Sequence, residues 1–163
     1  MARAGVSDVY SESNDLLQMF LGIEVATTQV FRVTNALGEA LEDQQEQAIP
    51  HEELPEGEVV YASMDGSMIL TQAGWKEVKL GRIFPGSAVE VVGKKKRNRI
   101  VESIYSACLG GCHEFLPRFE ASLGTWADQP EQWVFITDGA EWIRHYIQDR
   151  FPQATHILDY FHA

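Results

Sequence analysis

Three apolar runs in the second half of the chain each lead into an aspartate. The runs cover residues 59–64, 133–137 and 157–158, and they lead into Asp65, Asp138 and Asp159. Short apolar runs bounded by polar and glycine residues predict buried strands. Each predicted strand would therefore place one carboxylate at its C-terminal end.

The alternation of apolar and polar residues predicts further elements around these strands. The expected strands are 58–64, 67–72, 75–84, 133–137 and 155–158, and the expected helices are 100–123, broken near Gly110-Gly111 or Pro117, and 140–150. Glycine turns at Asp65-Gly66 and Ala73-Gly74 would join the first three strands into an antiparallel meander, which Val89–Val92 could extend. Crossovers through helices imply parallel pairing among the first, fourth and fifth strands. The predicted fold class is α/β, with a mixed sheet in the order meander, then α-β-α-β.

A small all-helical segment is predicted at residues 1–46. Apolar residues at helical spacing indicate helices over 8–21 and from about 25 to 45, with a turn at 22–24. This outline fits a helix-turn-helix that binds DNA. The second helix carries only one base, Arg32, and the segment is acidic, so a helical pair that docks on a protein or dimerises is the alternative.

Residues 47–57 are polar and contain Pro50, Pro55 and Gly57, which is typical of a linker. His51 in this segment is expected to be exposed to solvent. The predicted organisation is therefore helical region 1–46, linker 47–57 and sheet-containing domain 58–163.

Composition narrows the class of protein. With 163 residues, of which 45% are hydrophobic, the chain can form one ordinary domain with a small appendage. No apolar run is long enough to span a membrane, and residues 1–5 lack the apolar segment of a signal peptide, so a cytoplasmic location is expected. Cys108, Cys112 and His113 could supply three zinc ligands, but no second ligand pair follows at zinc-finger spacing, which favours small buried residues.

Positive charge is concentrated in one region of this acidic chain. The net charge is −11, yet residues 59–100 carry 8 basic and 3 acidic residues. The bases of interest are Lys76, Lys79, Arg82, Lys94, Lys95, Lys96, Arg97 and Arg99. A local basic region can bind a polyanion such as DNA, and the alternative is a solvated face of a hairpin.

Carboxylates that converge at strand ends form a hard, oxygen-rich site. Such a site suits Mg²⁺ or Mn²⁺, and two such ions can support cleavage and transfer of phosphodiester bonds. Asp65 and Asp138 are the expected metal ligands, because their parallel strands would lie side by side. The alternative for each Asp-Gly pair is an ordinary turn in which the aspartate only caps the backbone.

Several motifs resemble one family of enzymes. They are Ser63-Met-Asp65-Gly66-Ser-Met68, Gly74-Trp-Lys-Glu-Val-Lys-Leu-Gly-Arg82, Ile136-Thr-Asp138-Gly-Ala-Glu-Trp-Ile143 and Ile157-Leu-Asp159-Tyr-Phe-His162. In this order they resemble bacterial insertion-sequence DDE transposases of the Kra-type and Mutator-like group. The resemblance covers residues 58–163 and implies an RNase H-like fold preceded by a DNA-binding region. It also implies that Asp65 and Asp138 are the first two catalytic acids, with Asp159 and His162 as a supporting signature.

The same resemblance implies a further glutamate on a helix well beyond His162, whereas the sequence ends at Ala163. The expectation is therefore a transposase fragment that binds DNA, oligomerises as its family does, and neither cuts nor joins DNA alone. Low stability, or a partner that supplies the missing part, is also expected.

Two other functions remain open. One is a non-catalytic DNA- or protein-binding derivative that regulates a full-length transposase. The other is a phosphatase or nuclease of another α/β class, against which the absence of an Asp-x-Asp-x-Thr phosphate loop near Asp65 counts.

Overall fold

The computed structural model describes residues 10–45, 47–48, 50–93, 97–128 and 132–159. Its internal contacts divide the chain into two compact units, Met1–Gln45 and Glu46–Ala163.

The first unit contains the two predicted helices. Helix α2 spans Tyr10–Leu21 and helix α3 spans Thr27–Gln45, which confirms both. Leu17 and Val30 are buried, while Leu37 and Leu41 on α3 remain 42% and 48% exposed. The predicted apolar stripe of α3 is therefore only partly covered by the residues that the structure describes.

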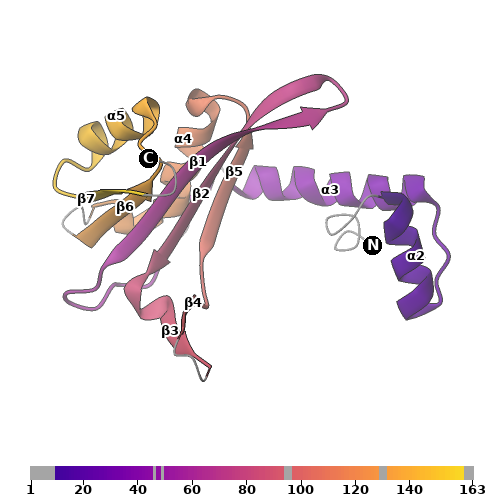
Figure 1. Ribbon diagram of the computed structural model, residues 1–163, viewed down its shortest axis with the longest axis horizontal. Coiled ribbons are helices and arrows are strands. Elements are labelled where there is room, and N and C mark those ends of the chain that lie inside the picture. The colour runs from indigo at the N-terminus through magenta and orange to yellow at the C-terminus, as the bar shows by residue number, and fades with distance from the viewer. Residues whose placement is uncertain (1–9, 46, 49, 94–96, 129–131, 160–163) are drawn as a thin grey trace. The chain divides into compact units, whose positions relative to one another are not determined.

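The second unit is built on a five-stranded mixed sheet (Figure 1). Its strands are β1 (Val60–Thr71), β2 (Gly74–Pro85), β5 (Ile104–Leu109), β6 (Trp133–Thr137) and β7 (Thr155–Leu158), in the spatial order β5-β2-β1-β6-β7. Strands β5, β2 and β1 pair antiparallel, whereas β1, β6 and β7 pair parallel. The predicted α/β class and the parallel pairing are confirmed.

The prediction that one strand ends at Asp65 and another begins at Ser67 was wrong. Residues 60–71 form one continuous strand, in which Asp65 is paired with Leu80 and Gly66 with Lys79. The Asp-Gly turn signal is overridden because β2 offers an unbroken antiparallel partner along this length. The chain turns only before Gly74, whose φ of 95° favours glycine.

The third strand of the meander lies elsewhere in the sequence than predicted. Residues 104–109 form β5 instead of the start of a helix, and they pair with Val78–Ile83 of β2. Ser106 and Cys108 are buried while Tyr105 is exposed, which is the alternation of a strand. Helix α4 begins after the two glycines and spans Cys112–Leu123 as one helix with Pro117 inside it.

Val89–Val92 does not extend the meander. It forms β3, which pairs with β4 (Arg97–Ile100) in a separate two-stranded sheet after the short 3-10 turn Gly86–Ala88. Figure 1 shows this hairpin and the tip of the β1–β2 hairpin at opposite ends of the unit. Arg97 and Arg99 therefore belong to a strand of this hairpin and not to a loop.

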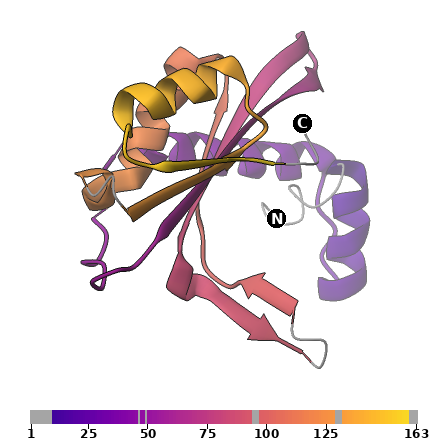
Figure 2. The same ribbon diagram turned by 60° about the vertical axis from the view of Figure 1, so that its left-hand side comes forward.

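One face of the main sheet carries the core. Helix α4 and helix α5 (Glu141–Arg150) lie on this face (Figure 2), because both right-handed crossovers move in the same direction across the sheet. The buried apolar side chains between sheet and helices include Val60, Ala62, Ile83, Phe115, Phe119, Leu123, Trp133, Phe135, Ile143 and Phe151. On the opposite face Leu80, Tyr105 and Ile157 are 46%, 55% and 45% exposed.

The predicted linker is packed against this unit over part of its length. The His51 ring stacks on Trp126 with 4.0 Å between ring centres, and its Nε2 lies 2.8 Å from the carbonyl oxygen of Ser122. The Trp126 Nε1–H donates to the carbonyl oxygen of Glu52 at 3.0 Å. His51 is therefore a packed residue, and its predicted exposure to open solvent was wrong. Trp126 itself lies in the 3-10 segment Gly124–Asp128.

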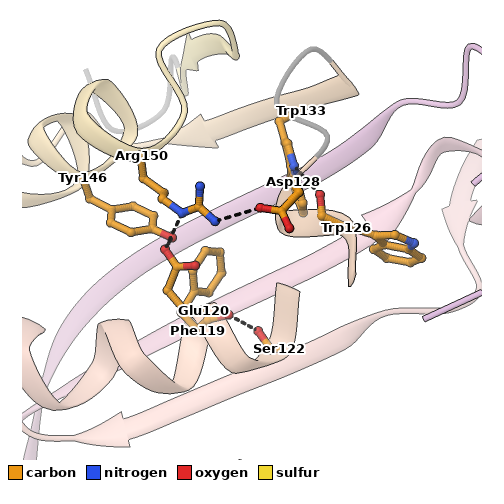
Figure 3. Close-up of polar contacts among 8 residues, drawn as sticks. All are labelled: Phe119, Glu120, Ser122, Trp126, Asp128, Trp133, Tyr146 and Arg150. Atoms are coloured by element: carbon orange, nitrogen blue, oxygen red, sulfur yellow. Dashed lines mark hydrogen bonds and ion pairs between the residues drawn. The ribbon is translucent and has the colours of Figure 1, made fainter. Parts of the chain in front are cut away.

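A polar cluster joins α4 to α5 (Figure 3). The Tyr146 hydroxyl donates to Glu120 Oε1 at 2.6 Å, and Arg150 Nε lies 3.5 Å from the same oxygen. Arg150 Nη2 lies 3.6 Å from Asp128 Oδ1. Burial raises the pKa of Tyr146 well above its ordinary value, and the hydrogen bond and charge of Glu120 raise it further.

Tyr146→Phe is expected to lower the free energy of unfolding by about 1.5 kcal/mol, because the phenol–carboxylate hydrogen bond is lost. Between about pH 7 and pH 10, Tyr146 is protonated in both the folded and unfolded states, so this stabilisation is constant. Above pH 10 only the unfolded state ionises, and the advantage of the wild-type chain declines. Urea titrations of the wild-type chain and of Tyr146→Phe, below and above pH 10, measure this difference in the free energy of unfolding. A free-energy difference between the two proteins that grows above pH 10 would contradict the hydrogen bond from Tyr146 to Glu120.

Candidate metal and phosphate site

The strand register places the three predicted aspartates in one row. Met64 of β1 is level with Thr137 of β6, and Thr137 is level with Leu158 of β7. In each strand the next residue is the aspartate. The backbone N–H of Asp159 donates to the carbonyl oxygen of Thr137 at 2.8 Å, which extends the β6–β7 pairing by one residue. Because adjacent strands are about 4.8 Å apart, Asp138 lies between Asp65 and Asp159.

The three aspartates line one pocket of about 330 Å³ on the sheet face opposite α4 and α5. The lining residues are Ser63, Met64, Asp65, Leu80, Arg82, Tyr105, Ile136, Thr137, Asp138 and Asp159. This pocket brings together residues from five strands or strand ends that lie up to 96 positions apart, from Ser63 to Asp159.

Asp65 reaches the pocket because β1 continues past the end of β6. Their pairing stops at Met64 and Thr137, so Asp65 is the first residue of β1 without a β6 neighbour. It is exposed, and its Oδ1 accepts a hydrogen bond from the Gly66 N–H at 2.7 Å. The carboxylate thus stands at the open edge of the sheet, although not at the end of its own strand.

Asp138 is fixed by the turn that leads into α5. Its Oδ1 accepts from the Ala140 N–H at 2.9 Å, as in an Asx turn. Gly139 has a φ of 80°, and a Cβ at this position would lie 2.6 Å from Leu158 Cδ2. The predicted Asp-Gly turn is therefore confirmed here, and glycine is required both by backbone conformation and by space.

Arg82 supplies the positive charge of the pocket. Its Nε–H donates to Ser103 Oγ at 2.9 Å, and its Cζ lies 5.2 Å from the Phe84 ring centre and 5.5 Å from that of Tyr105. A guanidinium within about 6 Å of an aromatic ring centre is stabilised by cation–π attraction, and Arg82 has two such rings. Arg82 is thus the one predicted DNA-binding residue that lines the pocket among those that the structure describes.

Lys79 has a different role from the predicted one. Its side chain is only 4% exposed, its Nζ lies 2.7 Å from Glu77 Oε1, and it sits 4.2 Å from the centre of the Trp142 ring. It faces the helices, because it pairs with Gly66 and Cys108 on the buried side of the sheet. Lys79 therefore ties β2 to α5 and is not available to contact a phosphate.

The other predicted basic residues lie away from the pocket. Lys76 is exposed on the projecting part of β2, level with Ile69, while Arg97 and Arg99 are exposed on β4. Lys94, Lys95, Lys96 and the signature residue His162 lie outside the described residues. The basic region of the sequence is thus divided among several parts of the fold.

The donor atoms of the pocket suit a hard divalent cation. Mg²⁺ is commonly bound by one or two carboxylates, with water and substrate phosphate oxygens completing its shell, and Asp65 and Asp138 offer that set. Within the described residues, there is no place where three or more His, Cys, Asp or Glu side chains lie close enough together to hold one metal ion. The arrangement therefore fits an ion shared with a phosphate better than one enclosed by protein.

The cysteines do not contribute a second metal site in the described part of the chain. Cys108 is buried in β5 and the half-buried Cys112 begins α4, and neither forms a disulfide bond within the described residues. The interpretation as small buried residues is confirmed for Cys108, although it lies in a strand and not in a helix, and it was wrong for His113, which is exposed on α4.

Sequence reasoning missed Tyr105 and Ser103 as members of the site region. Both fall in the stretch assigned to a helix, where they would not have faced β2. The alternation of Ile104, Ser106 and Cys108 with Tyr105 was the available signal for a strand that places Tyr105 beside Arg82.

Comparison with known proteins supplies no assignment: no model of a known protein family matches the chain, and no curated protein matches it. Among the described helices, none has the length and apolar character needed to cross a membrane.

Proposed function

We propose that residues 58–163 form an RNase H-like nucleic-acid domain whose Asp65 and Asp138 bind Mg²⁺ or Mn²⁺ for phosphodiester chemistry of the DDE-transposase kind. The observation that carries this proposal is the row of aspartates at one level of β1, β6 and β7. The sheet supports it, since an antiparallel meander followed by two parallel strands is the order expected of that fold.

The residues of the pocket have distinct roles in this proposal. Asp65 and Asp138 provide the metal ligands, and the hydrogen bond from Ala140 orients the Asp138 carboxylate. A bound divalent ion would neutralise phosphate charge and activate the attacking oxygen. Arg82 holds a non-bridging phosphate oxygen on the same sheet face, and Asp159 supports the site from the adjacent strand.

Cleavage and strand transfer by the resembled family use a further glutamate. The described lining of the pocket contains none. We therefore expect these residues to bind metal and nucleic acid, and catalysis to require an additional acid, from this protein or from a partner such as a second copy.

The test measures binding of a fluorescent DNA duplex by anisotropy, with Ca²⁺ or Mn²⁺ and with EDTA. Because the chain carries a net charge of −11, DNA affinity is expected to increase about tenfold or more when a divalent ion bridges carboxylates and phosphate. Asp138→Asn is expected to abolish this increase. Asp149→Asn removes the same charge from an exposed position of α5 and is expected to preserve it. Equal affinity with metal and with EDTA would contradict the proposal.

The second candidate is a non-catalytic derivative that regulates a transposase through its helical region. The exposed Leu37 and Leu41 on the acidic helix α3 favour docking on a protein over contact with DNA. The absence of any metal-dependent gain in duplex affinity, in the wild-type chain and in Asp138→Asn alike, would favour this candidate. Whether the helical unit contacts DNA stays a prediction.

A further inference from the structure

Two adjacent rows of side chains cross the open face of the sheet. The first row joins Leu80 of β2 to Asp65 of β1 and continues to Asp138. The second row, two residues away along each strand, joins Tyr105 of β5 to Arg82 of β2 and to Ser63 of β1. Residues level with one another on neighbouring strands share a face, so both rows face the pocket that contains the aspartates.

The second row has features of a nucleotide-binding surface. Tyr105 is 55% exposed, although its ring lies only 5.5 Å from Arg82 Cζ. Leu80, which is 46% exposed, provides an apolar surface beside it. Arg82 donates from Nε to Ser103 Oγ among the hydrogen bonds of the described residues, so its two terminal nitrogens can donate to a further acceptor. An exposed ring next to a fixed guanidinium matches a base next to its phosphate.

The spacing of the two rows agrees with a short length of nucleic acid. From the strand separation and the rise per residue, Asp65 and Arg82 are about 8 Å apart at the backbone, and Asp65 and Tyr105 about 12 Å. A strand whose phosphate lies at the carboxylates therefore passes Arg82 before its base reaches Tyr105.

We propose that this surface binds an unpaired nucleotide, with Arg82 on its phosphate and its base stacked on Tyr105. The inference rests on the proposed function, and it adds the substrate class: single-stranded nucleic acid, or a strand end that is locally unpaired, at the aspartate pocket.

The chemistry favours a single strand over a continuous duplex. Bases in a duplex are stacked on one another and cannot lie on a protein ring, whereas an unpaired base can. Among the described residues that line the pocket, Arg82 is the one basic side chain, and Lys79 is buried on the other side of the sheet, so two backbones would not be matched by a row of bases. Three carboxylates in the pocket disfavour a polyanion unless stacking and a divalent ion offset their charge.

The experiment compares a fluorescent single-stranded oligonucleotide with its fully paired duplex by anisotropy, in Ca²⁺ and in EDTA. The single strand is expected to bind more tightly. Tyr105→Ala is expected to weaken single-strand binding by about tenfold or more, with little effect on the duplex. Tyr105→Phe keeps the ring and is expected to retain single-strand affinity. Leu109→Ala, an exposed apolar change on the same strand, is the control and is expected to stay within about twofold.

Mn²⁺ titration of the same proteins separates the two proposals. If Mn²⁺ binds at the aspartates but Tyr105→Ala leaves single-strand affinity unchanged, the nucleotide surface is refuted and the metal site stands. If Mn²⁺ does not bind but the single-strand preference depends on the ring of Tyr105, the stacking surface stands and the metal site is refuted. Equal affinity for single strand and duplex overturns the inference in either case.

Discussion

Asp138→Asn is expected to lower the affinity of the chain for Mn²⁺ by at least roughly 10- to 100-fold, the loss typical even of supporting residues at metal sites. Asp138 lies at the centre of the aspartate row, between Asp65 and Asp159. Its carboxylate can therefore share an ion with either neighbour. Asparagine keeps the size and the acceptor oxygen of the Asx turn but removes the charge. Asp65→Asn is expected to have a similar effect. Isothermal titration calorimetry measures both.

The control for this prediction is Asp149→Asn. Asp149 is exposed on α5 and does not line the pocket. Asp149→Asn therefore changes the net charge by the same amount as Asp138→Asn but leaves the site unchanged. Its Mn²⁺ affinity is expected to match that of the wild-type chain. An equal decrease in all three variants would show that Mn²⁺ binds through general attraction to an acidic protein.

Leu123→Ala is expected to lower the free energy of unfolding of the second unit by about 2–5 kcal/mol. Leu123 is fully buried at the end of α4, within the core between the helices and the sheet. Truncation removes buried apolar surface and leaves a cavity that the packed aromatic side chains around it can fill only in part. Since domains of this size are typically stable by about 5–15 kcal/mol, the loss is a large fraction of the total.

Leu70→Ala is the matched control, because it is the same substitution at a residue that is 69% exposed on β1. Its effect is expected to stay within about 0.5 kcal/mol. All four tryptophans lie in residues 46–163, so tryptophan fluorescence in a urea titration reports on this unit alone. Similar urea midpoints for Leu123→Ala and Leu70→Ala would contradict the burial of Leu123 in the core.

The parallel half of the sheet could be predicted from sequence because its signals are local and agree with one another. Residues 133–137 form a buried run, Gly139 ends it, and 141–150 carry a clear helical pattern up to Phe151. Short strands with helical crossovers leave few topologies to consider. For this reason the element order predicted two parallel strands that lead into Asp138 and Asp159.

The antiparallel half could not be predicted in detail because distant pairing decided it. Asp65-Gly66 has the composition of a turn, yet pairing with Leu80 and Lys79 keeps it extended. Residues 104–109 contain enough apolar residues at mixed spacing to fit a helix, and only the edge of β2 makes them a strand. Both errors came from local signals that tertiary pairing overrides.

The candidate site also combines residues that local signals predicted with residues that depended on distant strand pairing. The three aspartates were identifiable as ends of apolar runs, although Asp65 lies inside a longer strand. Charge alone could not distinguish Lys79 from Arg82. Lys79 is buried beneath Trp142, whereas Arg82 lies three residues further along β2 and faces the pocket on the other side of the sheet. That distinction depends on which face of β2 each residue occupies, and it required the strand boundaries.

The central claim is that a divalent ion binds at Asp65 and Asp138, beside Asp159. Paramagnetic broadening of backbone amide signals by substoichiometric Mn²⁺ tests it directly, because the effect reports the position of the ion. The amides of Gly66, Gly139 and Ala140, which adjoin the carboxylates, are expected to broaden first. Earlier broadening along the acidic helix α3, with these three amides unaffected, would contradict the account.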